Sequence, residues 1–199
     1  MKEMKIIDLL DDKSIRLNAE VHSKKEVLDT LVDLMDASGK LNDIETYRKG
    51  VYAREEEGST GIGEGIAIPH GKCDAVTKPG LAAMVVKDGV EFDALDGQPV
   101  TLMFLIAAPN TKDNVHLDVL SKLSVLMMDE VFVDALRNAK SADEFLDIID
   151  KADAEQGDID ERLADMNEAS ANGFKILAVT SCPTGIAHTY ICLLYTSDA

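Results

Sequence analysis

Long hydrophobic runs, closely spaced cysteines and an excess of basic residues are all missing from this sequence of 199 residues. No stretch reaches the roughly 18 apolar residues of a transmembrane helix, and the first residues lack the apolar region of a secretory signal. We therefore expect no direct insertion into a membrane. The three cysteines, Cys73, Cys182 and Cys192, show no CxxC spacing. This pattern is typical of a reducing cytoplasm and argues against a disulfide framework or a zinc site.

Basic residues are outnumbered, because 20 Lys and Arg stand against 37 Asp and Glu, which gives a formal net charge of −17. Such a charge disfavours nucleic acid and anionic lipid as partners and favours a basic protein surface. The apolar share of 46% is sufficient for a sizeable core. The length allows one ordinary domain plus a fragment, or two small domains.

Periodicity and turn residues predict an α/β domain over residues 1–150, with a mixed sheet flanked by helices. Short apolar runs between Gly, Pro and Asp indicate buried strands, and apolar residues at helical spacing after Ser or Asp indicate capped helices. In chain order we expect a strand or strand pair over 4–18, a helix from Ser23 to Gly39, a helix from Asp43 to about Glu57, strands over 81–86 and 100–107, a largely buried helix after Pro109, and shorter helices near 129–138 and 141–150.

The composition changes after residue 150. Residues 151–172 are rich in Ala, Asp, Glu, Asn and Gly, which predicts an acidic linker that is partly helical around Glu161–Met166. The apolar run 175–180 then predicts the first buried strand of a second α/β domain, which is incomplete in this chain.

One histidine stands out because of its setting. The segment Gly58–Lys72 contains four glycines before His70 and one directly after it, and Pro69 immediately precedes that histidine. Glycine permits close backbone approach and proline fixes φ, so we expect His70 on an exposed turn. Imidazole is largely neutral and nucleophilic near neutral pH. A lone histidine is more often structural or solvated, and His70 is distinguished from that case by the surrounding glycines.

A second loop follows the strand over 175–180 and carries Cys182. Backbone N–H groups after a buried strand form a site for phosphate and stabilise a thiolate. A tyrosine-phosphatase loop has arginine six positions after its cysteine, whereas this chain has His188 there. The bidentate clamp of arginine is therefore missing, and we expect a site that receives and passes on phosphate rather than a hydrolase.

Two segments together resemble a known family. Residues 4–150 resemble the fructose/mannitol-type enzyme IIA domain of the bacterial phosphoenolpyruvate-dependent sugar phosphotransferase system. This resemblance rests on the segment Arg54–His70, which reads REEEGSTGIGEGIAIPH, and on Asn114–Leu117, which reads NVHL. Residues 173–190 resemble the truncated start of a fructose-type IIB domain, whose cysteine loop matches Cys182–Thr189.

The resemblance implies a phosphotransferase and a role for each matching residue. His70 would accept a phosphoryl group from the phosphocarrier protein HPr and pass it to a IIB cysteine, which is Cys182 in this chain. His116 would orient or stabilise the phosphohistidine, and Arg54 would offset the phosphate charge. No cofactor and no metal is implied. The sugar, for which fructose is the first candidate, would enter through a membrane IIC partner, so a cytoplasmic location beside that partner is expected.

Three points stay open in the sequence. Residues 191–199 do not match the family and we interpret them as a non-native tail, which would leave Cys182 without a functional domain. A regulatory IIA-like protein of the nitrogen branch shares the fold and the histidine, and would act through protein binding. A metal-dependent hydrolase that uses His70 and His116 is a third reading, for which the sequence offers no compact cluster of ligands.

Overall fold

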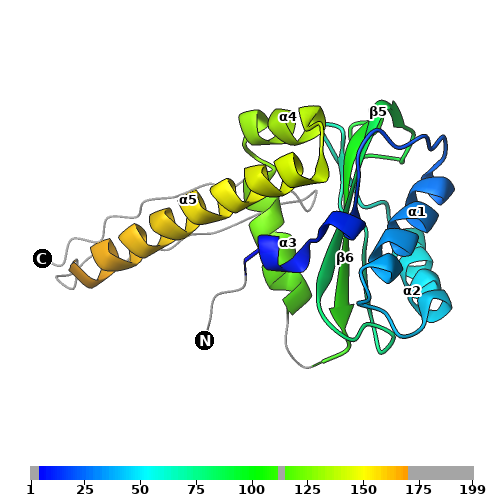
Figure 1. Cartoon of the computed structure of the whole chain (residues 1–199), viewed down its shortest axis with the longest axis horizontal. Helices are drawn as coiled ribbons and strands as arrows, with labels where there is room; N and C mark the ends of the chain where they lie inside the picture. Colours follow the sequence, from blue (N-terminus) through cyan, green and yellow to red (C-terminus); the bar gives the residue numbers. More distant parts are fainter. Residues whose placement is uncertain (1–4, 112–114, 170–199) are drawn as a thin grey trace, which may run out of the picture.

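A mixed β-sheet lies between two layers of helices in the computed structural model, which describes residues 5–111 and 115–169 (Figure 1). The strand order is β1-β5-β6-β3-β2, and β4 also pairs with β6. The long strands β5 (Gly80–Val90) and β6 (Val100–Pro109) are antiparallel neighbours. β1 is parallel to β5, β3 and β4 are parallel to β6, and β2 is antiparallel to β3. The fold class predicted for the first domain, a mixed sheet flanked by helices, is confirmed.

The remaining elements are short strands and the helices of the two layers. The strands are β1 (Ile15–Arg16), β2 (Gly61–Gly63), β3 (Ile66–Ala67) and β4 (His70–Cys73). One layer contains α1 (Lys24–Ala37) and α2 (Ile44–Glu57), and the other contains α3 (Val115–Leu126), α4 (Glu130–Asn138) and the start of α5 (Ala142–Ala169).

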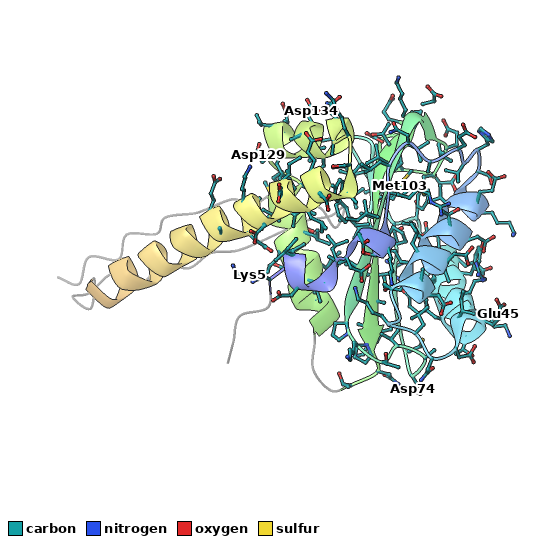
Figure 2. The ribbon with its side chains drawn as sticks, in the orientation of Figure 1. Lys5, Glu45, Asp74, Met103, Asp129 and Asp134 are labelled. Atoms are coloured by element: carbon teal, nitrogen blue, oxygen red, sulfur yellow. The ribbon has the colours of Figure 1, made fainter. Side chains whose placement is uncertain are left out.

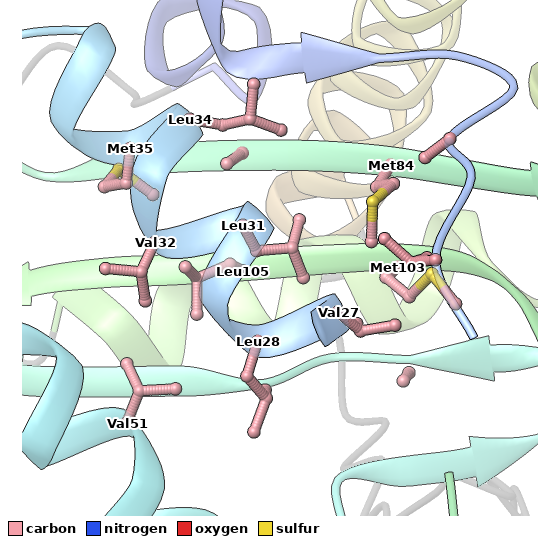
Figure 3. Packing of buried hydrophobic residues seen from close by; sticks show 14 of the residues in the cluster. Val27, Leu28, Leu31, Val32, Leu34, Met35, Val51, Met84, Met103 and Leu105 are labelled. Carbon is pink, nitrogen blue, oxygen red and sulfur yellow. The ribbon is translucent and has the colours of Figure 1, made fainter. Parts of the chain in front are cut away.

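The two central strands are apolar throughout because helices cover both of their faces. Along β6, Leu102 and Phe104 pack on the α3 side, while Met103 and Leu105 pack on the α1 side. Successive side chains of a strand point to opposite faces, so burial on both sides removes the polar alternation. Figure 3 shows Leu31 of α1 against this second set. Charged side chains such as Glu45 and Asp134 lie outside the two cores (Figure 2).

Both helices of the first layer begin at the predicted caps. The Ser23 side chain accepts a hydrogen bond from the backbone N–H of Glu26, and Asp43 accepts one from Thr46. Satisfying these free N–H groups fixes where each helix starts. After α1 the chain turns at Gly39, whose φ of +71° explains the glycine there.

The first residues differ from the predicted strand pair over 4–18. They form two 3-10 turns, η1 (Ile7–Leu9) and η2 (Asp12–Ser14), and only β1 joins the sheet. Asp11 is the reason for the second turn, because its carboxylate accepts hydrogen bonds from the N–H groups of Lys13 and Ser14. Such local side-chain bonds compete with a sheet ladder.

Helix α3 is less buried than its apolar sequence predicts. Val119 and Leu123, on the inner face of α3, are buried in the core between this helix and the sheet. Leu117 and Val125 are exposed by 50% and 43%. These two residues lie outside the face that packs on β6, since a helix turns only part of its surface to a sheet.

Helix α5 continues to Ala169, whereas the sequence predicted a helix over 141–150 and a linker over 151–172. The alanine and glutamate content of this segment favours a helix, and no proline interrupts it. α5 starts beside α3 and α4, and its C-terminal part extends away from the rest of the domain (Figure 1). The domain boundary at residue 150 stays a prediction, and residues 170–199, with the expected IIB start and tail, lie outside the described residues. No helix of the described ranges is long and apolar enough to cross a membrane.

Asp153 on α5 generates a pH-dependent prediction. Its carboxylate accepts a hydrogen bond of 3.0 Å from the backbone N–H of Ile7, and burial raises its pKa above the ordinary value. Between the ordinary and the raised pKa the folded state binds more protons than the unfolded state, so stability falls as pH rises through that window. In Asp153→Asn the side-chain oxygen is kept and the ionisation is lost. We expect the Tm of this variant, relative to the wild type, to increase between about pH 4 and about pH 7.

Calorimetric melts of wild type and variant across this range measure the effect. The exposed Asp150, on the same helix, supplies Asp150→Asn as the matched control. A Tm difference for Asp153→Asn that stays constant with pH would contradict the assignment.

Candidate functional site

His70 begins a strand rather than an exposed turn. Residues 66–73 run parallel to β6 in one register, in which Ile66 is opposite Leu102 and His70 is opposite Ile106. The hydrogen-bonded pairing with β6 is interrupted between β3 and β4, because Pro69 has no N–H to donate. The Pro69 carbonyl still accepts a hydrogen bond of 3.0 Å from the N–H of Ile106. This pairing makes His70 half-buried and fixes its backbone to the central strand.

Strand alternation decides which way His70 faces. Ile66 and Ile68 belong to the core on the α3 side, and His70 lines a cavity together with both of them. The next residue, Gly71, faces α2, where an added Cβ would lie 3.0 Å from atoms of both Tyr47 and Val51. Glycine at this position therefore allows α2 to lie close to β4, beside the histidine.

The two ring nitrogens of His70 have different partners. Nδ1 lies 3.1 Å from the carbonyl oxygen of Ile68, and Nε2 lies 3.0 Å from Nε of Arg54. A carbonyl oxygen only accepts and a guanidinium only donates, so Nδ1 carries the proton and Nε2 presents its lone pair. Arg54 is in the last turn of α2 and also donates to the Gly58 carbonyl at 3.1 Å. The structure thus brings together the predicted Arg54 and His70.

A buried carboxylate that the sequence interpretation did not single out holds the start of the glycine-rich segment. Glu55 accepts hydrogen bonds from the N–H and the hydroxyl of Thr60, at 2.9 Å and 2.6 Å. Its other partner is Lys24, whose ammonium lies 2.9 Å from Oε1. A signal for this burial is present in the sequence, because Tyr47, Val51 and Glu55 recur every four residues on the inner face of α2.

The hydroxyl groups of Ser59 and Thr60, in the glycine-rich segment, both form hydrogen bonds within the protein. Ser59 donates to the Phe92 carbonyl at 2.7 Å, as Thr60 does to Glu55. Serine and threonine in turns commonly bond the neighbouring chain in this way. They hold the loop in place, in agreement with the ordinary role of turn hydroxyls.

The turn between β2 and β3 is held from outside by two further residues. Glu64 and Gly65 have φ of +54° and +71°. The Glu64 N–H donates to Asp96 at 2.8 Å, and its carbonyl accepts from the guanidinium of Arg137 on α4. Backbone N–H groups of Gln98 and Glu64 lower the pKa of Asp96. These contacts fix one wall of the cavity in front of His70, and neither residue was predicted.

The cavity has a volume of about 330 Å³ and combines one polar end with apolar walls. Arg54, Ser59, Thr60 and His70 provide polar groups. The apolar walls come from the segment that runs from β2 to β4, from α3 and from the residue that follows α3: Ile62, Ile66, Ile68, Leu120 and Met127. At the rim Leu95 and Met128 are exposed by 56% and 55%, so the entrance has an apolar border.

The other predicted site residues are placed only in part. His116 is the second residue of α3, and its side chain lies outside the described part of the structure. Cys182 falls in residues 170–199, which are also outside it. Cys73 is half-buried at the end of β4. Among the described residues no group of three His, Cys, Asp or Glu side chains is arranged to hold a metal ion.

Comparison with known proteins gives the site a context. The family model described as "Phosphoenolpyruvate-dependent sugar phosphotransferase system, EIIA 2" matches residues 8–152. The fructose-specific EIIABC component of this system from Bacillus subtilis is 47% identical over 188 residues, which cover 94% of this chain. The chain spans 29% of the length of that relative.

Solved structures agree with this match. Nitrogen regulatory protein IIA-Ntr from Neisseria meningitidis is 35% identical, with a TM-score of 0.67 over 72% of this chain and 98% of that chain. The complex of enzyme IIA of the mannitol system with phosphorylated enzyme IIB from Escherichia coli gives 27% identity and a TM-score of 0.63, over 71% of this chain and 97% of that chain.

The hydrogen bonds of His70 predict its tautomer. We expect the neutral ring to carry its proton on Nδ1, because the Ile68 carbonyl accepts only from that nitrogen. Nitrogen-15 NMR of the imidazole distinguishes a protonated nitrogen from an unprotonated one. The exposed His22 in the same spectrum serves as the reference for a solvated ring. A protonated Nε2 in neutral His70 would contradict the assignment.

The close packing at Gly71 gives a second prediction. Gly71→Ala forces a Cβ between Tyr47 and Val51, so we expect a loss of about 1–3 kcal/mol in the free energy of unfolding, with α2 displaced from β4. Gly50→Ala is the matched control, since nothing lies within 4 Å of the added atom there. This second change is within α2 and is expected to stabilise by about 0.5–1 kcal/mol. Urea unfolding measures both values, and equal effects of the two substitutions would refute the packing argument.

Proposed function

The chain belongs to the EIIA 2 family of the phosphoenolpyruvate-dependent sugar phosphotransferase system, and on this basis we propose that it is a phosphotransferase that carries a phosphoryl group on Nε2 of His70. The observation that carries this assignment is the pair of contacts at the ring. Ile68 fixes the proton on Nδ1, and Arg54 marks Nε2 as the nitrogen with the lone pair. Nε2 is therefore the nucleophile, and a guanidinium is already beside it.

The transfer needs no change at Nδ1. The Nε2 lone pair attacks the phosphorus of the phosphohistidine of HPr; a new P–N bond forms as the P–N bond to the carrier breaks, and the carrier imidazole leaves with that electron pair. The phosphorylated ring of His70 keeps its Nδ1 proton, and the Ile68 carbonyl stabilises the resulting positive ring. A cysteine thiolate of a IIB domain then attacks phosphorus, and Nε2 leaves with its electron pair as neutral imidazole is restored.

Arg54 has to change partners during this step. Its Nε–H occupies the Nε2 lone pair before transfer, at 3.0 Å, and this bond is lost when Nε2 binds phosphorus. The guanidinium then has N–H groups for the phosphoryl oxygens, with which it forms bidentate contacts. Phosphoryl transfer depends mainly on such positioning and charge stabilisation. His116 is proposed to contribute a further contact at the start of α3, and no cofactor takes part.

The cavity supports transfer between two proteins. Its apolar walls limit the access of water to a phosphohistidine, which favours passage of the group over hydrolysis. Apolar side chains at the rim, such as Leu95 and Met128, suit a protein surface that closes the entrance. We propose HPr and a IIB domain as the successive partners, in line with the mannitol IIA relative, whose structure is a complex with phosphorylated IIB.

The downstream steps follow from the fructose-specific relative. Its match covers 94% of this chain and so extends beyond residues 8–152, which supports the start of a IIB domain with Cys182 after α5. We propose that the phosphoryl group reaches a sugar, in first place fructose, through a IIB cysteine and a membrane IIC component. The domain would then work in the cytoplasm beside that component.

A regulatory role is the second candidate, because IIA-Ntr from Neisseria meningitidis covers 72% of this chain at 35% identity. In this role the chain would accept phosphate on His70 and act by binding other proteins. Transfer to IIB separates the two functions, since a regulator requires no cysteine acceptor.

The central test is phosphorylation from phosphoenolpyruvate with enzyme I and HPr. We expect acid-labile, base-stable label on His70, and loss of at least about a thousandfold in the labelling rate of His70→Ala, because the nucleophile is removed. His22→Ala is the control, since His22 is exposed and has no place in the site. Equal labelling of His70→Ala and the wild type would disprove the proposal.

Addition of complete IIB proteins for fructose and for mannitol then tests the acceptor. Transfer to the fructose-specific IIB supports the transport function, whereas label that stays on the chain with every IIB favours the regulatory one.

A further inference from the structure

Arg54 is followed by three glutamates, yet within the described ranges it forms no ion pair with a carboxylate. Its side-chain bonds go to His70 and to the Gly58 carbonyl. Glu56 and Glu57 are exposed to solvent. A cation close to several carboxylates normally attracts one of them. The unpaired state of the Arg54 charge therefore needs an explanation in the structure.

Glu55 is the carboxylate that would be expected to pair with Arg54, because it is the next residue in the sequence and its charge is buried. Its side chain is 5% exposed and lies against Lys24 and Thr60. Arg54 and Glu55 act on the same connection from two sides, since one binds the Gly58 carbonyl and the other binds the Thr60 N–H. A buried carboxylate without a cation would be strongly unfavourable and would turn to the nearest positive group.

Lys24 is held in place to meet this charge. It is the first residue of α1, and its ammonium contacts Glu55 at 2.9 Å, Asp93 at 3.2 Å and the Ser59 hydroxyl at 3.4 Å. The same ammonium lies 4.8 Å from the ring centroid of Phe92, within the range of a cation–π contact. Its side chain is only 23% exposed, so the pair with Glu55 is partly shielded from solvent.

We propose that Lys24 and Glu55 are positioning residues for phosphoryl transfer: Lys24 neutralises Glu55, so that Arg54 presents an uncompensated positive charge to the incoming phosphoryl group. This inference rests on the proposed function of His70 and goes beyond it, since neither residue contacts the ring. Glu55 anchors the loop and Lys24 removes the charge that this anchor would otherwise bring to the site. The two roles are separable by mutation.

The charge argument predicts a particular order among variants. Lys24→Met leaves Glu55 as the unpaired charge, which attracts Arg54 and opposes the phosphoryl group, so transfer from phosphorylated HPr slows by at least about tenfold. Glu55→Gln removes the negative charge and keeps one of the two oxygen acceptors for Thr60, so the loop anchor is weakened and the rate falls, but by no more than about threefold. The double variant Lys24→Met/Glu55→Gln is expected to recover to the same range. A residue that only stabilises the loop would give the reverse order, with Glu55→Gln as the slowest.

Two further variants serve as controls. Lys25→Met removes the neighbouring lysine, which pairs with Asp29 and is 76% exposed, and should leave transfer unchanged. Lys24→Arg keeps the charge and should retain the wild-type rate. If Lys24→Met fails to fold, as judged by thermal melts, the double variant and Lys24→Arg decide the question. Slow transfer by the double variant, or equal rates for Lys24→Met and Lys25→Met, would overturn the proposal.

A readout without HPr keeps this inference distinct from the proposed function. Inorganic phosphate is titrated into each variant while the Arg54 Nε–H signal is followed by NMR. We expect Lys24→Met to weaken the response by at least about fivefold and the double variant to restore it. If the wild type accepts no phosphate from HPr but shows this order, the proposed function fails and the charge compensation stands. If His70 is labelled normally and the order is absent, the charge compensation fails alone.

Discussion

The buried carboxylate of Glu55 is the contact on which the geometry of the site depends. It joins the end of α2 to the start of β2 through Thr60, and it joins both to α1 through Lys24. A buried charge is tolerated only when it is paired and hydrogen-bonded, and each of these conditions is met by a different segment. The need to compensate the charge of Glu55 therefore holds α1, α2 and the start of β2 together, and Arg54 is the residue next to Glu55 in α2.

The central strand provides the second constraint, because it fixes the histidine rather than the arginine. Residues 66–73 keep one register along β6 across the break at Pro69, and strand alternation turns His70 toward α3. Gly71 then faces α2 and lets that helix approach. The ring nitrogens are assigned by a carbonyl of the same strand and a guanidinium of the neighbouring helix. These two contacts leave Nε2 as the nitrogen that presents its lone pair.

Much of this fold is predictable from local signals. Ser23 and Asp43 cap their helices by bonds within one turn, and the apolar runs of β5 and β6 follow from burial on both faces. The first residues were not predictable in this way, since Asp11 stabilises a 3-10 turn in a segment with strand-like apolar residues. The length of α5 was missed because a polar composition is compatible with both a linker and a helix.

The sequence by itself determined which functional groups are present: a histidine that follows a glycine-rich segment, an arginine at the start of the same segment, and a family pattern that includes both. Tertiary structure decided how these groups are used. The strand position of His70 and the choice of Lys24 as the partner of Glu55 depend on contacts between segments far apart in the chain. The proton on Nδ1 is assigned by the carbonyl of Ile68, only two residues away, once the backbone is fixed in this conformation. Motif spacing specifies which residues are present, whereas charge compensation and hydrogen-bond direction are set by the distances that folding creates.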